Sequence, residues 1–399
     1  MTLAPQLRIH HVITRLIIGG AQENTVATII GLNEKPDIAV RLISGLSRGP
    51  EGSLENRFQN RLSLLQTVPE LVRPVHPWLD WRALRRLTRI FREDRPHIVH
   101  THSGKAGILG RMAAHRAGVP LILHTIHGPS FGVFQSWLPN QLFKTAERHA
   151  ARYTTHLISV ADAMTDQYLA AGIGRREQFT RIFSGFDLEP FLQARNDAQL
   201  RKSCGLTPEH FVIAKLARLS PLKGHDDLLA AAEKLIPRCP QARFLLIGDG
   251  PLRAEFEQKL RTRRMDQYFV FTGVVDPTTV PELLGLADVV VHFSRREGLP
   301  RALPQAMAAG KPIVSYHLDG APEVCFEGQT GFLIQPGAFD QIAARLLQLA
   351  SDEKLRTRLG NAGREWVRPR FSERTMVDAI YDLYIRLAEA RLLHAPSPV

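Results

Sequence analysis

The chain has 399 residues, of which 44% are hydrophobic and 23% are charged, so it is too long for one ordinary core and too apolar to be disordered. Its net charge of +12 favours anionic partners without distinguishing nucleic acid, anionic lipid and diphosphate-bearing small molecules. There is no signal-peptide core at the start, no apolar run approaches a membrane span, and the three scattered cysteines fit reduced thiols. We therefore expect a cytoplasmic protein of two domains that does not span a membrane.

Short apolar runs alternate with helical patterns along most of the chain, which is typical of βαβ units and parallel sheets. In the first half, strands that each precede a helix are expected near residues 7–12, 38–43, 98–101, 121–126 and 157–160. In the second half, strands are expected near residues 211–217, 242–248, 268–273, 288–293 and 311–316, with helices beginning near His225, Leu252, Val280 and Pro300. The predicted fold class is α/β, with two Rossmann-like doubly wound domains facing each other across a cleft.

The segment 188–208 is polar and lacks a clear apolar stripe, so we place the domain boundary there. The predicted domains are residues 1–188 and residues 189–373. In such an arrangement a ligand binds at the carboxyl ends of the strands.

A glycine pair follows the first expected strand. Gly19 and Gly20 precede a helix whose first turn would present backbone N–H groups, and a diphosphate fits such a place. A tight turn between strand and helix explains the pair equally well, so this motif alone is a weak indication.

Two cations follow the first strand of the second half. Arg218 and Lys223 lie in "ARLSPLKG", and two positive charges at a strand end suit a pyrophosphate leaving group. Solvated surface cations are the alternative. The neighbouring "GDGPLR" lacks the third glycine and the acidic residue of a dinucleotide-binding turn, so we interpret it as a tight turn.

The segment "REGLPRALPQAMAAGKPIVSYHLDGAPEV" carries Glu297, then the uncharged Gln305 eight positions later, then Glu323. Glu297 and Glu323 follow adjacent strands, so both are expected at the same edge of the sheet. An acidic loop residue faces solvent by default, but two at neighbouring strand ends indicate a site.

Three histidines also follow expected strands, His100 and His102 in "HIVHTHSGKAG" and His127 in "ILHTIHG". They could suggest a metal site, but there is no helical HxxxH pair and no nearby acidic or cysteine partner. Hydrogen bonding to a hydroxylated ligand is the favoured interpretation, and His127 is the best placed of the three.

Two further segments concern partners. The helix containing Arg82, Arg85, Arg86, Arg89 and Arg92 could meet an anionic membrane, or could simply be a solvated amphipathic helix. The aromatic cluster after His127 could bind an apolar acceptor, or could belong to the core; its members are Phe131, Phe134, Trp137 and Phe143.

Together these motifs resemble one family in the right order from about residue 10 to residue 390. They are the Gly19-Gly20 loop, "HTHSGKAG", "HTIHG", "SGFD", "ARLSPLKG", "GDGPLR", "SRREGLPRALPQAMAAGKPIV" and "GAPEV". The chain resembles the retaining glycosyltransferases of family 4, which have the GT-B fold. The resemblance implies that the C-terminal helix, residues 374–399, crosses back onto the first domain.

The resemblance also implies a nucleotide-diphosphate sugar as donor, bound mainly by the second domain, and a glycan or lipid-linked glycan as acceptor, bound mainly by the first. Glu297 and His127 would contact the donor sugar as catalytic residues, while Arg218, Lys223 and Gly20 would bind its diphosphate. Gly298, Leu299, Gln305 and Glu323 would complete the sugar and nucleotide site. No metal and no other cofactor is expected, because the two cations would replace a metal, and transfer would proceed with retention.

The family's motif usually has glutamate where this chain has Gln305, at a position that binds the ribose of the nucleotide. We therefore expect altered nucleotide binding and not loss of catalysis. Two other functions stay open, a nucleotide-sugar 2-epimerase of the same fold and a non-catalytic protein that binds sugar or nucleic acid. The expected location is the cytoplasm, with contact with the inner face of the membrane through the Arg82 to Arg92 helix left open; no nucleic-acid partner is expected.

Overall fold

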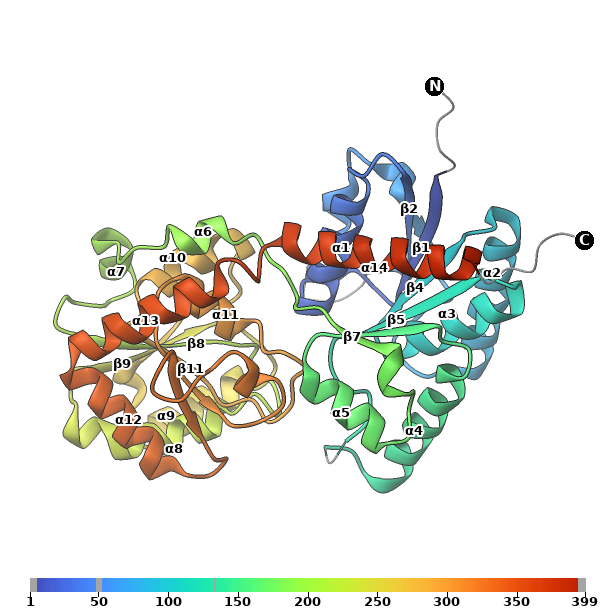
Figure 1. Ribbon diagram of the computed structural model, residues 1–399. Helices are drawn as coiled ribbons and strands as arrows, with labels where there is room; N and C mark the ends of the chain where they lie inside the picture. Colours follow the sequence, from blue (N-terminus) through green and yellow to red (C-terminus); the bar gives the residue numbers. More distant parts are fainter. Residues whose placement is uncertain (1–5, 48–51, 133, 394–399) are drawn as a thin grey trace, which may run out of the picture. The chain divides into compact units, whose positions relative to one another are not determined.

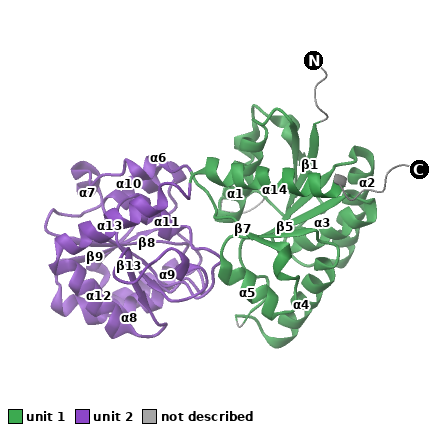
Figure 2. Ribbon diagram, viewed as in Figure 1, with its two compact units in different colours: residues 1–186, 372–399 green, residues 187–371 purple. Residues whose placement is uncertain are grey.

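The computed structural model describes residues 6–47, 52–132 and 134–393, and the chain forms two compact units (Figures 1 and 2). Unit 1 comprises residues 1–186 and 372–399, and unit 2 comprises residues 187–371. Each unit is a parallel β-sheet covered by helices. The predicted α/β class with two Rossmann-like domains is confirmed.

The sheet of unit 1 has the strand order β3-β2-β1-β4-β5-β6-β7, and every neighbouring pair is parallel. Its strands are β1 (Leu7–Ile13), β2 (Ile38–Ser44), β3 (Leu65–Thr67), β4 (Ile98–His102), β5 (Leu121–Ile126), β6 (His156–Ser159) and β7 (Phe179–Arg181). The central strands β4, β5 and β6 are buried along their whole length because helices cover both faces.

The helices of unit 1 are α1 (Gly20–Leu32), α2 (Pro77–Asp94), α3 (Gly104–Ala117), α4 (Trp137–Ala151), α5 (Asp162–Ala170) and α14 (Glu373–Leu393), with 3-10 turns η1 (Glu55–Phe58), η2 (Leu62–Leu64) and η3 (Arg176–Gln178). Side chains of α1 and α14 pack on one face of the sheet, against Ile9 and Ile13 of β1. Side chains of α2 and α3 pack on the other face, against Val12. This division follows the alternation of side chains along β1.

Helix α14 completes unit 1 although it follows unit 2 in the sequence. Gly31 of α1 lets it approach closely, since a Cβ atom at Gly31 would lie 2.7 Å from a methyl group of Val377. Lys35 forms an ion pair with Asp378 at 2.7 Å, and the Tyr381 hydroxyl donates to Asp37 at 2.7 Å. The C-terminal helix is therefore an integral part of the first unit.

The sheet of unit 2 has the order β10-β9-β8-β11-β12-β13, again with parallel neighbours. Its strands are β8 (Phe211–Leu216), β9 (Ala242–Ile247), β10 (Phe269–Phe271), β11 (Val289–His292), β12 (Ile313–Tyr316) and β13 (Gly331–Ile334). The short edge strands β3, β7 and β13 were not predicted; β3 and β7 have only three residues each, which do not form an apolar run.

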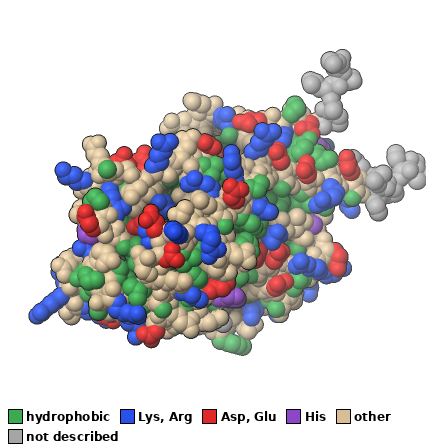
Figure 3. All heavy atoms as spheres, turned by 60° about the vertical axis from the view of Figure 1, so that its left-hand side comes forward, with side chains coloured by type: hydrophobic (Ala, Val, Ile, Leu, Met, Phe, Trp, Pro, Cys, Tyr) green, Lys and Arg blue, Asp and Glu red, His purple; other side chains and the backbone are tan. Residues whose placement is uncertain are grey.

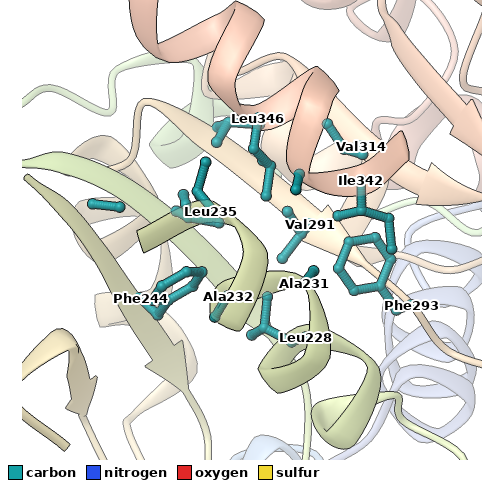
Figure 4. Close-up of a cluster of buried hydrophobic side chains, with 14 of the residues drawn as sticks. Leu228, Ala231, Ala232, Leu235, Phe244, Val291, Phe293, Val314, Ile342 and Leu346 are labelled. Carbon is teal, nitrogen blue, oxygen red and sulfur yellow. The ribbon is translucent and has the colours of Figure 1, made fainter. Parts of the chain in front are cut away.

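The helices of unit 2 are α6 (Glu189–Leu192), α7 (Ala198–Ser203), α8 (His225–Leu235), α9 (Arg253–Thr262), α10 (Val280–Gly285), α11 (Ala302–Ala308), α12 (Phe339–Ser351) and α13 (Glu353–Val367), with 3-10 turns η4 (Ile236–Arg238), η5 (Asp266–Tyr268), η6 (Pro277–Thr279) and η7 (Ala321–Glu323). Leu228 and Leu235 of α8 pack with Ile342 and Leu346 of α12 over Val291 of β11 (Figure 4). This cluster forms the core on one face of the sheet.

The polar segment 188–208 is ordered and belongs to unit 2, where it contains α6 and α7. Arg201 is only 5% exposed and donates to the carbonyl oxygens of Thr207 at 2.9 Å and His210 at 2.6 Å. A buried arginine that satisfies backbone carbonyls explains why the segment looks polar and yet packs. The unit begins at residue 187, next to the boundary placed at residue 188 from the sequence.

Both sheets reverse their strand order at one point, between β1 and β4 in unit 1 and between β8 and β11 in unit 2. At such a point the loops after the two central strands diverge to opposite faces and leave a crevice, where ligands of doubly wound folds bind. The loops that follow these four strands are therefore the places in which to look for a site. None of the described helices combines the length and the apolar character that a bilayer span requires.

Candidate active site

The reversal point of unit 2 brings together the loop after β8 and the loop after β11. Leu222 and Gly224 in the first loop have positive φ values of 68° and 71°. A Cβ atom at Gly224 would lie 2.0 Å from the carbonyl oxygen of Phe293, so only glycine permits this approach. The backbone N–H of Arg295 donates to the Leu222 carbonyl at 2.8 Å. The two loops are thus fixed against each other on either side of Lys223.

Lys223 and Glu297, two of the three charged residues predicted from these loops, form an ion pair. Lys223 Nζ lies 2.5 Å from Glu297 Oε1, and the two side chains are 29% and 22% exposed. Residues 74 positions apart in the sequence meet here because β8 and β11 are neighbours in the sheet. The site therefore holds a cation and a carboxylate side by side, partly open to solvent.

A third loop, after β12, orients Glu297 through its backbone. The Glu297 N–H donates to Asp319 Oδ2 at 2.6 Å, and the Gly320 N–H donates to the Gly298 carbonyl at 3.0 Å. Asp319 has a φ of 50°, an uncommon value for aspartate that these contacts hold in place. Burial raises the pKa of Asp319, partly offset by its bond to the Glu297 N–H.

Glu297 keeps its negative charge although burial disfavours the ionised form. Burial acts to raise its pKa, but the charge of Lys223 and its hydrogen bond outweigh that effect and hold the pKa below its usual value. His292 Nε2 lies 3.7 Å from Glu297 Oε1, and burial lowers the pKa of His292 to about 3. At neutral pH the ion pair therefore sits beside a neutral imidazole.

Buried polar atoms without hydrogen-bond partners lie beneath this ion pair. Lys215 on β8 is 1% exposed, and its ammonium group has no hydrogen-bond partner but faces the Phe293 ring at 5.6 Å. Burial, and then the charge of Lys223, lower the pKa of Lys215 to about 7. Both ring nitrogens of His292 also lack hydrogen-bond partners. Of these two buried groups only Lys215, with its pKa near 7, can carry positive charge at neutral pH.

The other predicted residues of unit 2 differ in exposure and in the element that carries them. Arg218 follows β8 and is exposed, while Gly298 and Leu299 are buried directly after Glu297. Gln305 lies on α11 and is half-buried; among the described residues its side-chain amide has no hydrogen-bond partner. Glu323 ends the turn η7, close along the chain to the loop that binds Glu297.

The remaining predicted residues belong to unit 1. Gly20 is the exposed first residue of α1, after the loop that follows β1. His127 directly follows β5, and its Nε2 lies 3.1 Å from His102 Nδ1. In the described parts of the chain, three histidines could together hold a metal ion, His11, His100 and His102, and all three are fully buried.

Sequence reasoning missed Asp319, Lys215 and His292 as parts of the site. Asp319 precedes a glycine in the loop after a strand, a turn signal that could have drawn attention to it. Lys215 and His292 lie inside apolar strand runs, and a polar residue at a buried strand position is itself a signal.

The partner surfaces proposed from the sequence differ in exposure. All five arginines of α2 are exposed, as are Trp78 and Trp81, whose rings stack at 5.0 Å. Phe131 is only 2% exposed and belongs to the core, whereas Trp137 is 73% exposed. On the face seen in Figure 3, basic and acidic side chains are interspersed.

Comparisons with known proteins bear on both units. The sequence profile of the family described as "Glycosyl transferases group 1" matches residues 196–366, and that of the "Glycosyl transferase 4-like domain" matches residues 34–182. The chain is 31% identical over 322 residues to the UDP-Gal:alpha-D-GlcNAc-diphosphoundecaprenol alpha-1,3-galactosyltransferase of Escherichia coli, covering 80% of this chain and 82% of that one. The chain therefore belongs to the family 4 glycosyltransferases.

Two other similarities extend the comparison. A GDP-mannose-dependent alpha-(1-6)-phosphatidylinositol monomannoside mannosyltransferase of Mycolicibacterium smegmatis is 27% identical over 294 residues, covering 71% of this chain and 75% of that protein. The crystal structure of HepE from Anabaena in complex with UDP superposes with a TM-score of 0.79 at 21% identity, covering 95% of this chain and all of that one. The architecture of the two units is GT-B.

Proposed function

We propose that the protein transfers a hexose-type sugar from a nucleoside-diphosphate sugar to a hydroxyl group of a glycan or lipid-linked glycan. The ion pair between Lys223 and Glu297 at the reversal point of unit 2 carries this proposal. The cation suits a diphosphate, and the carboxylate suits the hydroxyl groups of a sugar. A nucleotide sugar contains both of these groups in one molecule.

In this proposal unit 2 is the donor domain. Lys223 leaves Glu297 when the donor arrives and, with Arg218, neutralises the diphosphate; Arg218 can bind two phosphate oxygens at once, and Lys223 acts as a point charge. Glu297, released from Lys223, accepts hydrogen bonds from sugar hydroxyls. Gly298 and Leu299 place their backbone beside the sugar, and Glu323 stands at the same edge of the sheet.

Unit 1, including residues from 374 onward, is the acceptor domain in this proposal. Gly20 supplies a backbone N–H to the diphosphate from the start of α1, as the positive end of a helix favours. His127 donates a hydrogen bond to the donor sugar near the reacting carbon.

The reaction proceeds with retention and without a metal ion. The bond to phosphate breaks through an oxocarbenium-like state, the departing phosphate accepts the proton of the attacking hydroxyl, and that hydroxyl attacks from the same face. Arg218 and Lys223 stabilise the growing charge on the diphosphate. Glu297 is paired with Lys223, and this mechanism does not require the two carboxylates about 5 Å apart that a retaining glycosidase uses.

The proposal is tested by a thermal-shift screen followed by a turnover assay. We expect UDP or GDP, and the matching sugar donor, to raise the melting temperature, because a ligand that binds only the folded state stabilises it. UDP-galactose and GDP-mannose are the first donors to try, since the two curated relatives use them by name. An epimer formed from donor alone would support an epimerase instead, and salt-sensitive RNA binding without donor binding would support a nucleic-acid protein.

Gln305 is proposed to contact the ribose of the nucleotide. Gln305→Glu should bind the nucleoside diphosphate about fivefold more tightly, because a carboxylate accepts a stronger, charge-assisted bond from the ribose hydroxyls. Isothermal titration with UDP and GDP measures the difference, and turnover should change by less than about threefold. Gln258→Glu, on α9, is the matched control. Weaker nucleotide binding by Gln305→Glu alone would contradict the ribose contact.

We also propose that α2 meets an anionic membrane at the inner face, where a lipid-linked acceptor would lie. Five exposed arginines supply charge, and the stacked, exposed Trp78 and Trp81 suit the interface between lipid and water. Flotation with vesicles containing about 30% phosphatidylglycerol should recover the protein at low salt and lose it with phosphatidylcholine alone. Equal recovery with both lipids, or recovery unchanged in Arg85→Gln/Arg89→Gln, would exclude this surface.

A further inference from the structure

A continuous chain of hydrogen bonds runs through the core of unit 1. It begins on β5 at the Thr125 hydroxyl, which lies 2.6 Å from His100 Nε2. His100 Nδ1 lies 2.5 Å from the hydroxyl oxygen of Tyr384 on α14, and that oxygen lies 3.1 Å from His11 Nε2. Three strands and the C-terminal helix thus contribute to one polar path in an otherwise apolar core.

The same path continues to the predicted active-site histidine. His11 Nδ1 lies 2.9 Å from His102 Nε2, and His102 Nδ1 lies 3.1 Å from His127 Nε2. The rings of His11 and His102 stack at 5.1 Å, and those of His102 and His127 at 5.3 Å. Five hydrogen bonds in series therefore connect Thr125 to His127. We call this path the histidine relay.

The three internal imidazoles of the relay are neutral. Burial lowers the pKa of His11 to about 3 and lowers the pKa values of His100 and His102 well below the usual 6.5, and neighbouring histidines lower them further. A neutral imidazole has one donor and one acceptor nitrogen, and a phenol has one proton to donate. Each member that accepts on one side must therefore donate on the other, so all five bonds point in the same direction.

Thr125 determines which direction that is. Among the described residues its hydroxyl has one hydrogen-bond partner, His100 Nε2, and the side chain is 4% exposed. If His100 donated to it, the Thr125 proton would be buried with no acceptor, which is unfavourable. The Thr125 hydroxyl therefore donates to His100 Nε2. His100, Tyr384 and His11 each accept one hydrogen bond and donate the next in the same direction. At the end of the relay, His102 Nδ1–H donates to His127 Nε2.

We infer that the histidine relay holds His127 in the single tautomer that carries its proton on Nδ1. Thr125, His100, Tyr384, His11 and His102 are then positioning residues, and His127 presents an N–H donor and no basic nitrogen to its ligand. This inference rests on the proposed function only for what His127 contacts, a sugar oxygen that would accept a hydrogen bond. The tautomer itself does not depend on that function.

The test is proton-detected NMR of the ligand-free protein labelled with 15N-histidine, in which the pattern of two-bond N–H couplings distinguishes the tautomers. The His127 signals are assigned by their loss in His127→Gln. Wild-type protein should show His127 with Nδ1 protonated. In Thr125→Val, His100 Nε2 loses its only hydrogen-bond partner among the described residues, so neither direction of the relay is favoured and the Nδ1–H fraction should fall toward about half. Transferase turnover should fall about twofold with it, in proportion to the competent fraction.

Matched variants distinguish an effect on the tautomer of His127 from a change in the packing of the core. Thr125→Ser keeps the hydroxyl and should restore both the tautomer and turnover. Tyr384→Phe breaks the relay in its middle and should also mix the His127 tautomers, whereas Tyr381→Phe loses a hydrogen bond to Asp37 on the same helix and should not. The inference is overturned if wild-type His127 is protonated on Nε2, if Thr125→Val leaves its tautomer unchanged, or if stoichiometric zinc binds the relay. Absence of turnover with every donor would overturn the proposed function and leave the tautomer test intact.

Discussion

Glu297→Gln should lower kcat/KM for sugar transfer by about 100-fold or more, equivalent to about 3 kcal/mol of transition-state stabilisation. The substitution keeps the shape of the side chain but removes the charge that pairs with Lys223 at 2.5 Å and that is proposed to accept hydrogen bonds from the donor sugar. Steady-state assays with the donor found in the thermal-shift screen measure this loss of kcat/KM. Loss of the charge should appear mainly in kcat, because the sugar contact strengthens as positive charge develops at the anomeric carbon.

The control for this variant is Glu282→Gln, which changes an exposed glutamate on α10 of the same unit. It should leave kcat and KM unchanged within about twofold, since surface substitutions away from a site have small effects. If Glu297→Gln retained wild-type turnover while remaining folded, Glu297 would not be the sugar contact. The site would then have to be sought elsewhere.

Lys223→Met should weaken binding of the nucleoside diphosphate by about 100-fold, because it removes one of the two cations proposed to meet the diphosphate. It should also change the pH dependence of stability. In the wild type the lowered pKa of Glu297 stabilises the fold at neutral pH, and this contribution is lost as pH falls through that pKa. Without Lys223, burial dominates and raises the pKa, so the variant should be less stable at pH 7, by about 2 kcal/mol, and the deficit should shrink toward pH 4.

Titration calorimetry with the nucleoside diphosphate and urea unfolding at pH 7 and pH 4 test the two effects separately. Lys234→Met is the matched control, since Lys234 forms an ion pair with Asp340 at 2.8 Å on the surface of the same unit. Lys234→Met should lower the free energy of unfolding by less than about 1 kcal/mol at both pH values and leave nucleotide binding intact. A deficit in Lys223→Met that did not depend on pH would show that Glu297 keeps its low pKa without Lys223.

Much of the fold could be predicted because its strands are short apolar runs in a regular alternation with helices. The run "LILHTI" predicts β5 with the bounds that the structure has, residues 121–126. Edge strands β3 and β7 were missed because "LQT" and "FTR" carry no apolar period, and they form only because a neighbouring strand pairs with them. Helix α11 begins at Ala302, two residues after the expected start near Pro300, since a proline favours the start of a helix without fixing it.

The site was less predictable than the fold. Strand ends identified Lys223 and Glu297 singly, but their ion pair depends on β8 and β11 becoming neighbours, which only the strand order determines. His102 and His127 were singled out, whereas His11 was hidden inside the run "IHHVI" and Tyr384 inside a helix of mostly core residues. A hydrogen bond between residues 373 positions apart cannot be inferred from local pattern.

Helix α14 has a consequence for biosynthesis. Unit 2 is continuous in the sequence, whereas unit 1 needs residues from 372 onward to cover one face of its sheet and to supply Tyr384 to the histidine relay. Domains generally fold as they leave the ribosome, the N-terminal one first. Here the later unit can finish folding first, and the earlier one waits with an apolar face and several buried imidazoles uncovered. We expect nascent chains that stop before α14 to recruit chaperones through this face and to lack the protease resistance that unit 1 gains when the helix docks.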